Sequence, residues 1–169
     1  CAQVKVVRKP RVVILTTGDE LVDVDQPLTP GKIRDTNSYT LAGLVEQSGG
    51  DPIRLPIAGD SLEAVRNLYR AALAQNPNMI LSSAGVSVGT ADLVKTVMQE
   101  YGNIDFWRIN LRPGKPLAFG NIGGTPFFGL PGNPVSSMVT YEVFVRPALY
   151  KMAKCPHEAE TILATTTEV

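Results

Sequence analysis

Short apolar runs alternate with segments of helical periodicity along most of this chain. The runs typical of buried strands are 11–17, 52–57, 78–83 and 104–109. The segments with helical spacing are 38–48, 61–75, 91–101 and 134–152. Because a helix that joins two strands of one sheet brings the second strand back in parallel, the alternation predicts an α/β fold. We expect three layers around a doubly wound, mostly parallel sheet.

The stretch 116–130 breaks this alternation. Two apolar runs, 116–120 and 125–130, flank Asn121-Ile122-Gly123-Gly124 with no helical segment between them. Closely spaced runs joined by glycines are typical of a β-hairpin. The sequence therefore predicts one antiparallel hairpin within the sheet.

Composition limits the chemistry available to such a fold. The formal net charge is zero and 19% of the residues are charged, which argues against nucleic acid as a partner. No apolar run reaches the ~20 residues of a membrane span, so no membrane partner is expected. A disulfide between Cys1 and Cys155 stays possible, but a reduced, cytoplasmic chain is the simpler interpretation. The single histidine, His157, leaves catalysis to carboxylates, lysine, backbone amides and a bound cation.

Unusual residues follow the predicted strands at their carboxyl ends, where ligands bind in this class of sheet. After the run 78–83, the segment SAGVSVGTAD precedes a predicted helix. Its glycines and serines are Ser83, Gly85, Ser87 and Gly89. Backbone amides in such a loop bind anions at a helix N-terminus, although a plain flexible loop has the same composition. The segment matches neither the Walker A nor the dinucleotide-binding glycine pattern.

Carboxylates also collect at this edge. Asp19 and Glu20 follow the first strand. Asp60 follows the second strand, and Asp92 is the last residue of the SAGVSVGTAD segment. A cluster of these acids would bind Mg²⁺, because hard cations prefer oxygen ligands. Two of them also have structural interpretations: Asp60 and Glu63 have the spacing of a helix capping box, and Asp92 suits a helix dipole.

Two proline-containing segments complete the edge. In RPGKP, prolines bracket Lys115, so that Lys115 and Arg112 suit an oxyanion or phosphate better than they suit a solvated surface pair. In PGNPVS, Pro134 is placed to begin a helix, and Gly132 permits a ligand to approach the backbone. Asn133 offers a donor and an acceptor, so this helix start is expected to face an anion.

Five segments of the chain occur in the same order as the sequence motifs of one known protein family. They are TTGDEL (16–21), GKIRDTN (31–37), GVSVGTADLVK (85–95), RPGKPLAFG (112–120) and GLPGNPVS (129–136). From about residue 9 to 152 they resemble the molybdopterin-binding domain of the MoeA/gephyrin E-domain family. The resemblance implies molybdopterin molybdotransferase activity: adenylated molybdopterin is hydrolysed with help from a divalent cation such as Mg²⁺, molybdate is inserted, and AMP is released. It also implies a homodimer for the full-length protein.

The resemblance implies roles for residues of the matching segments. Catalytic roles are implied for Glu20, Asp60, Asp92 and Lys115, and the three acids are the implied metal ligands. The residues implied to bind molybdopterin, its phosphate or molybdate are Thr17, Gly18, Asp19, Asp35, Asn37, Ser38, Ser83, Gly85, Ser87, Gly89, Arg112, Pro113, Gly114, Pro131, Gly132, Asn133, Pro134 and Ser136. Ala84 and Thr90 depart from the family pattern, in which a glycine and an acidic residue are usual at these positions.

The same resemblance predicts how the chain is divided. Residues 1–8 are expected to lead in from a preceding domain, 9–152 to form the molybdopterin-binding domain, and 153–169 to begin a truncated C-terminal β domain. Two other functions stay open. One is the adenylyltransferase built on the same domain type, although RPGKP, TGDEL and the trailing strand argue against it. The other is a ligand-binding or scaffold module without turnover.

Overall fold

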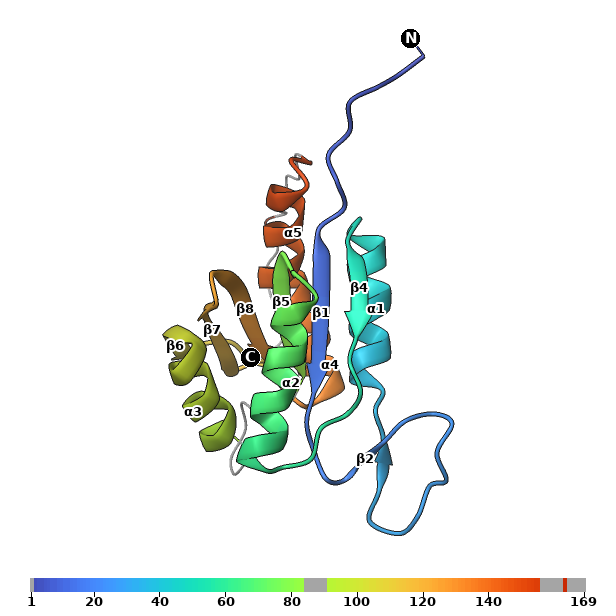
Figure 1. The fold of residues 1–169 in the computed structure, drawn as a ribbon, viewed down its shortest axis with the longest axis vertical. Coiled ribbons are helices and arrows are strands. Elements are labelled where there is room, and N and C mark those ends of the chain that lie inside the picture. Colours follow the sequence, from blue (N-terminus) through green and yellow to red (C-terminus); the bar gives the residue numbers. More distant parts are fainter. Residues whose placement is uncertain (1, 84–90, 156–162, 164–169) are drawn as a thin grey trace.

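A six-stranded sheet forms the centre of the molecule (Figure 1). The structure is a computed structural model that describes residues 2–83, 91–155 and 163, apart from the side chains of 91, 92 and 106–108. The strands of the sheet, in spatial order, are β4 (Asp51–Arg54), β1 (Arg11–Thr16), β5 (Met79–Ser83), β8 (Thr125–Leu130), β7 (Pro116–Ile122) and β6 (Gly102–Arg108). A separate small sheet pairs β2 (Leu21–Val22) with β3 (Ile33–Arg34).

Strand directions confirm the predicted sheet. β1 pairs in parallel with β4 and β5, and β5 pairs in parallel with β8. β7 runs antiparallel to its neighbours β8 and β6. Gly123 and Gly124 join β7 to β8 with φ values of 56° and 85°, as a tight hairpin turn requires. The fold is therefore a mostly parallel α/β sheet with one antiparallel hairpin.

Helices cover both faces of the sheet (Figure 1). They are α1 (Asn37–Gln47), α2 (Leu62–Ala74), α3 (Ala91–Tyr101) and a continuous helical run of α4 (Pro134–Thr140), the π-helical turn η1 (Tyr141–Val145) and α5 (Arg146–Met152). One apolar cluster, with Tyr69 of α2 and Val97 of α3, packs on one face. The other cluster, with Leu41 of α1 and Leu149 of α5, packs on the opposite face. The predicted three layers are confirmed.

The central strands are apolar on both sides because both sides are buried. Val12, Val13, Ile14 and Leu15 of β1 are all 0% exposed. Val13 and Leu15 belong to the cluster under α2 and α3, whereas Val12 and Ile14 belong to the cluster under α1 and α5. Because successive side chains enter opposite buried clusters, the strand is apolar at every position.

The edge strand β6 starts earlier than its apolar run. The run predicted a start at residue 104, but β6 begins at Gly102, which pairs with Ile122 of β7. A Cβ atom at Gly102 would lie 1.8 Å from the Asn121 carbonyl oxygen, so the two backbones approach closely only because this residue is glycine. The apolar pattern therefore missed residues that pair through the backbone alone.

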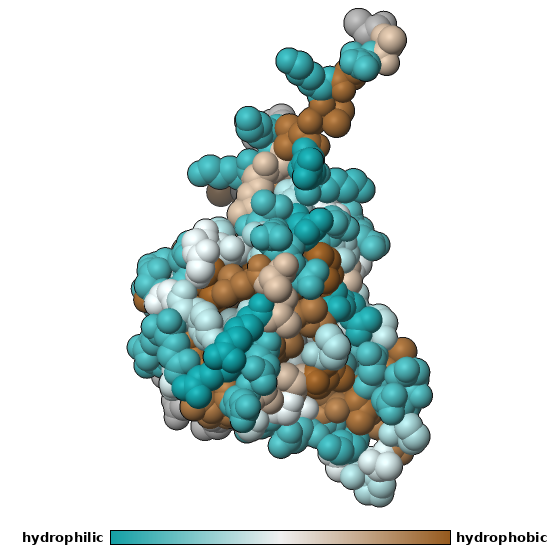
Figure 2. Space-filling model, in the orientation of Figure 1, coloured by the Kyte–Doolittle hydropathy of each residue, from teal (hydrophilic) through white to brown (hydrophobic). Residues whose placement is uncertain are grey.

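The N-terminal segment lies outside the body of the molecule. Residues before β1 extend away from the sheet (Figure 1), and the space-filling view shows apolar residues along them (Figure 2). Val4, Val6 and Val7 are 75%, 84% and 50% exposed. This segment leaves at the amino end of β1, so it does not reach the edge where the strands end. None of the helices in the described ranges has the length and hydropathy that a membrane span requires.

Candidate functional site

The loops that follow the parallel strands meet at one edge of the sheet. The described loops at this edge are 17–20, 55–61, 109–115 and 131–133. The glycine-serine loop, with Gly85, Ser87 and Gly89, lies outside the described residues, and so does the side chain of Asp92. The geometry of the candidate site is therefore built from the other four loops.

Asp19 and Asp60, predicted to share a site, meet directly. The Asp60 N–H donates to Asp19 Oδ1 at 3.0 Å, and the Asp19 N–H donates to Asp60 Oδ2 at 3.2 Å. Beside them, the Gly18 N–H donates to the Ala58 carbonyl at 3.1 Å. These bonds join the loop after β1 to the loop after β4, although the two aspartates are 41 positions apart in sequence.

The interpretation of Asp60 as a helix cap is wrong. Ser61 is the N-cap of α2, and its hydroxyl accepts a hydrogen bond from the Ala64 N–H at 3.2 Å. Aspartate and serine are both good N-cap residues, so the sequence offered two adjacent choices. The helix begins one residue later than the capping-box spacing implied, and this leaves the Asp60 carboxylate facing Asp19.

Buried oxygens without a partner lie at the same edge. Within the described part of the chain, Asp60 Oδ1, Thr16 Oγ1, Thr17 Oγ1 and Ser137 Oγ are buried and make no hydrogen bond. A buried polar group left unpaired costs about 1–3 kcal/mol. Asp60 Oδ1 thus has an unused acceptor position beside Asp19, which a water, a cation or a ligand donor would satisfy. Neither Thr16 nor Ser137 was among the predicted binding residues.

Glu20 and Lys32 flank the aspartate pair. Glu20 folds back over Gly18, where a Cβ atom would lie 2.6 Å from Glu20 Oε2 and where φ is +150°. The Lys32 ammonium donates to the Asp19 carbonyl. Lys32 was missed as a site residue, and its place in the matching segment GKIRDTN was the only signal for it. The edge therefore presents carboxylates and a lysine side by side.

The carboxylates fit a hard cation by their chemistry. Among the described residues no three His, Cys, Asp or Glu side chains are grouped as a metal site, but the predicted third acid, Asp92, has no described side chain. The unpaired Asp60 Oδ1 and the exposed Glu20 are oxygen donors of the kind that Mg²⁺ takes, mostly through its own water. The residues present are therefore compatible with Mg²⁺ bound through oxygen.

The segment Pro131-Gly132-Asn133-Pro134 starts a helix, as predicted. Asn133 is the N-cap of α4, and its Oδ1 accepts from the Ser136 N–H at 3.1 Å. Pro134 occupies the first helical turn, where a missing N–H costs nothing. Pro131 is buried, whereas Gly132, Asn133 and Pro134 are exposed at the edge. The acceptor of Asn133 is thus engaged within the helix start.

We expect Asn133→Ala to destabilise the protein by about 1 kcal/mol, because it removes the side-chain acceptor that caps α4. Urea unfolding followed by circular dichroism would measure the change. Asn133→Ser, which keeps a capping oxygen, should restore most of the lost stability. An unchanged unfolding midpoint in the alanine variant would contradict this role for the cap.

The predicted residues Asp35, Asn37 and Ser38 fix α1 to its neighbours. Asp35 is 3% exposed, and its carboxylate accepts from the Ser38 N–H at 3.0 Å. The Asn37 side-chain amide donates to the Gly132 carbonyl at 2.8 Å. The Ser38 hydroxyl accepts from Arg54 at 2.9 Å. The Asn37 and Ser38 side chains therefore hold the loop before α4 and the strand β4 against α1, and Asp35 bonds to the first turn of α1 itself.

The RPGKP loop lies against the start of the last helical run. Gly114 is buried at φ +121°, and a Cβ atom there would lie 2.6 Å from Thr140 Cγ2. The Ile109 N–H donates to the Lys115 carbonyl at 3.1 Å, which closes the loop. Arg112, Pro113 and Lys115 are exposed. The two cations are thus held on a closed, packed loop with their charges in solvent.

A group of three side chains anchors the excursion between β1 and α1, defined here as residues 21–34. The Tyr39 hydroxyl donates to Asp23 Oδ1 at 2.6 Å, and this bond, with the Val24 N–H and Arg54, lowers the pKa of Asp23 below its ordinary value. The Arg54 guanidinium lies over the Tyr39 ring, 3.4 Å from its centre, and 3.5 Å from Asp23 Oδ1. No pattern in the sequence indicated this long-range group.

We expect the excursion to loosen in acid. An aspartate with a lowered folded pKa stabilises the fold above its unfolded value of about 3.9, and this contribution is lost as the pH falls through the folded pKa. Hydrogen exchange of residues 22–26, corrected for intrinsic rates, should therefore lose protection below about pH 4. Asp23→Asn should abolish this pH dependence, and Asp51→Asn, at the amino end of β4, should retain it. Identical profiles for the wild type and Asp23→Asn would contradict the assignment.

Comparison with known proteins identifies relatives of the chain as a whole. Residues 13–151 match the family model described as a probable molybdopterin binding domain. The chain is 45% identical over 156 residues to a molybdopterin molybdenumtransferase of Nostoc sp., covering 90% of this chain and 36% of that protein. It is 42% identical to the enzyme of that name from Haemophilus influenzae, covering 89% of this chain and 37% of that protein. The chain thus spans little more than a third of these curated relatives.

Two solved structures are also similar to this chain. The molybdopterin biosynthesis MoeA protein of Pyrococcus horikoshii is similar with a TM-score of 0.79 and 34% identity, over 87% of this chain and 36% of that one. The molybdopterin biosynthesis enzyme MoaB of Thermus thermophilus is similar with a TM-score of 0.63 and 19% identity, over 87% of this chain and 98% of that one. The second likeness shows the fold alone.

Proposed function

The chain belongs to the molybdopterin-binding domain family, and we propose that the carboxyl edge of its sheet binds adenylated molybdopterin for molybdate insertion and AMP release. The names of its relatives support a place in molybdenum cofactor biosynthesis. The observation that carries the proposal is the reciprocal Asp19–Asp60 pair, with Asp60 Oδ1 buried and unpaired among the described residues. An unpaired carboxylate oxygen of this kind can accept a hydrogen bond from a water molecule or bind a cation beside a phosphate.

Each part of the edge has a role in this proposal. Asp60 would orient the water that cleaves the phosphoanhydride, and with Glu20 and Asp92 it would hold a divalent cation. The bound cation would supply positive charge to the phosphate oxygens. Lys115 and Arg112, exposed on their closed loop, would attract phosphate or molybdate. The positive charge of these residues would offset the negative charge of the substrates.

Calorimetry with adenylated molybdopterin tests the proposal. We expect saturable binding that strengthens with Mg²⁺, and chromatography should show AMP release when molybdate is added. Formation of adenylated molybdopterin from molybdopterin and ATP would instead favour the adenylyltransferase. Binding without AMP release would favour a ligand-binding module. Absence of binding in every condition would show that the described edge does not form the site by itself.

We also propose that the full-length protein is a homodimer that acts in the cytoplasm. Met138 and Val143, on the last helical run, are 43% and 49% exposed, which supports a protein contact on that helix. Light scattering of the full-length protein would test the dimer, and a monomeric mass would contradict it.

A further inference from the structure

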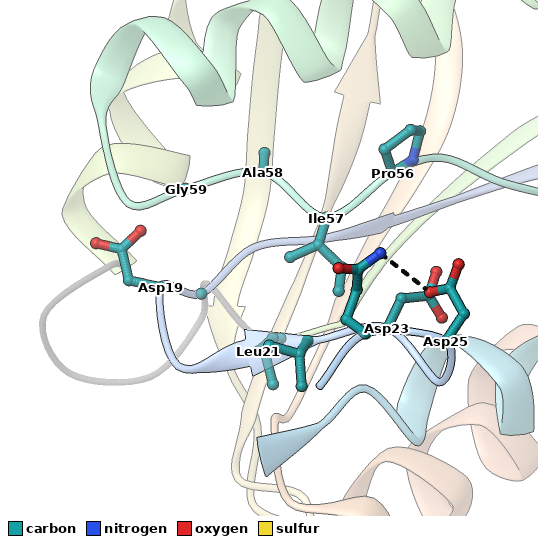
Figure 3. Close-up of a pocket in the computed structure, with 11 residues that line it drawn as sticks. Asp19, Leu21, Asp23, Asp25, Pro56, Ile57, Ala58 and Gly59 are labelled. Atoms are coloured by element: carbon teal, nitrogen blue, oxygen red, sulfur yellow. Dashed lines mark hydrogen bonds between the residues drawn. The ribbon is translucent and has the colours of Figure 1, made fainter. Parts of the chain in front are cut away.

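A pocket of about 450 Å³ lies next to the aspartate pair, between the start of the 21–34 excursion and the segment that follows β4 (Figure 3). Its lining residues lie within 18–26 and 56–59. The volume falls within the range of about 300–1,000 Å³ typical of small-molecule sites. Most of this lining was not among the predicted site residues, so the pocket extends the site.

Apolar and polar side chains share the lining, and its charged groups are all carboxylates. Leu21 and Ile57 come from opposite sides of the pocket, with Pro56 beside Ile57 (Figure 3). The described lining includes no lysine or arginine, so the pocket does not suit a phosphate or molybdate. It suits an uncharged ring that brings hydrogen-bond donors, because a carboxylate only accepts.

Asp25 is the carboxylate best placed to accept those donors. Asp23 already accepts from Tyr39 and the Val24 N–H, and Asp19 already accepts from the Asp60 N–H. Asp25 contacts only the Gln26 side-chain amide, at a long 3.5 Å, among the interactions of the described residues. Arg34 donates to the carbonyls of Asp23 and Gln26 and so holds the backbone on both sides of Asp25.

We propose that this pocket holds the pterin ring of the substrate, with Asp25 accepting hydrogen bonds from its 2-amino-pyrimidine edge. The inference rests on the proposed function, and it specifies which end of the substrate occupies the pocket. A pterin presents two adjacent donors, the 2-amino group and N3–H, and a carboxylate accepts both. Adenine presents a donor beside an acceptor, which repels a carboxylate oxygen. The carboxylate therefore selects the pterin end over the adenylate end.

Binding of 6-hydroxymethylpterin, followed by its own fluorescence, tests the pocket without the rest of the substrate. We expect saturable quenching by the wild-type chain and at least about tenfold weaker binding by Asp25→Asn, since hydrogen bonds to a charged group are lost. Asp51→Asn makes the same change of charge at the opposite edge of the sheet and should bind like the wild type. Lumazine, which has an oxo group in place of the 2-amino group, should bind Asp25→Asn and wild type alike.

The outcomes separate this inference from the proposed function. Equal pterin affinity of Asp25→Asn and wild type, or no pterin binding by the wild type, would overturn the pterin assignment. Adenylated molybdopterin would then still bind if the proposed function holds. Conversely, pterin binding that depends on Asp25, together with no binding of adenylated molybdopterin, would support the pocket and contradict the proposed function.

Discussion

Replacing Asp60 by asparagine should lower the rate of AMP release from adenylated molybdopterin by about 10²–10⁴-fold. The asparagine oxygen can still accept from the Asp19 N–H, so the contact between the two loops is retained. The negative charge on the buried, unpaired Oδ1 is lost, and with it the group proposed to orient water and hold a cation. Chromatographic measurement of AMP under saturating Mg²⁺ and molybdate gives the rate.

The matched control is Asp51→Asn, which removes an exposed carboxylate at the amino end of β4. Its rate of AMP release should stay within about twofold of the wild-type rate, because substitutions of exposed residues far from the candidate site are close to neutral. Thermal unfolding of both variants should stay close to that of the wild type. If Asp60→Asn released AMP at the wild-type rate, Asp60 would be only a link between loops and the catalytic role would be withdrawn.

The sheet could be predicted from the sequence because its central strands are buried on both faces. Val12 to Leu15 form an unbroken apolar run, and the spacing of Val65, Leu68, Tyr69 and Ala72 marks the buried face of α2. Such local patterns do not depend on distant residues. The start of β6 at Gly102 was missed because it depends on pairing with β7, which is a long-range contact.

The excursion between β1 and α1 could not be predicted for the same reason. Its strands β2 and β3 have two residues each, too few to produce a pattern. Their position depends on Arg54 and Tyr39, which come from β4 and α1. Long-range side-chain contacts of this kind leave no periodic signal in a single sequence.

The candidate site was predicted in outline. The rule that ligands bind at the carboxyl edge placed Asp19 and Asp60 at the same edge, but the sequence could not show that the two side chains meet, because the rule does not specify side-chain orientation. For this reason the sequence could not decide between Asp60 and Ser61 as the cap of α2. It also could not show that Asp35 and Ser38 are buried and bonded to each other.

Replacing Phe127 by alanine should destabilise the protein by about 3–5 kcal/mol. Phe127 is 0% exposed, lies opposite Ile80 of β5 and Gly120 of β7, and its ring centre is 5.9 Å from that of Tyr69. Truncation leaves a cavity under α2, which the rigid sheet cannot close. Urea unfolding would measure the loss, and the melting temperature should fall by about 2–4 °C for each kcal/mol.

Val135→Ala is the matched control for Phe127→Ala, because Val135 is 61% exposed and its truncation opens no cavity. It should change stability by less than about 0.5 kcal/mol. Asp60 immediately precedes Ser61, the N-cap of α2, and α2 packs over Phe127. Partial loosening of this layer should therefore also weaken Mg²⁺-dependent ligand binding before the protein unfolds. A Phe127→Ala variant as stable as Val135→Ala would show that this layer is not a close-packed core. The carboxylate edge would then need another source of rigidity.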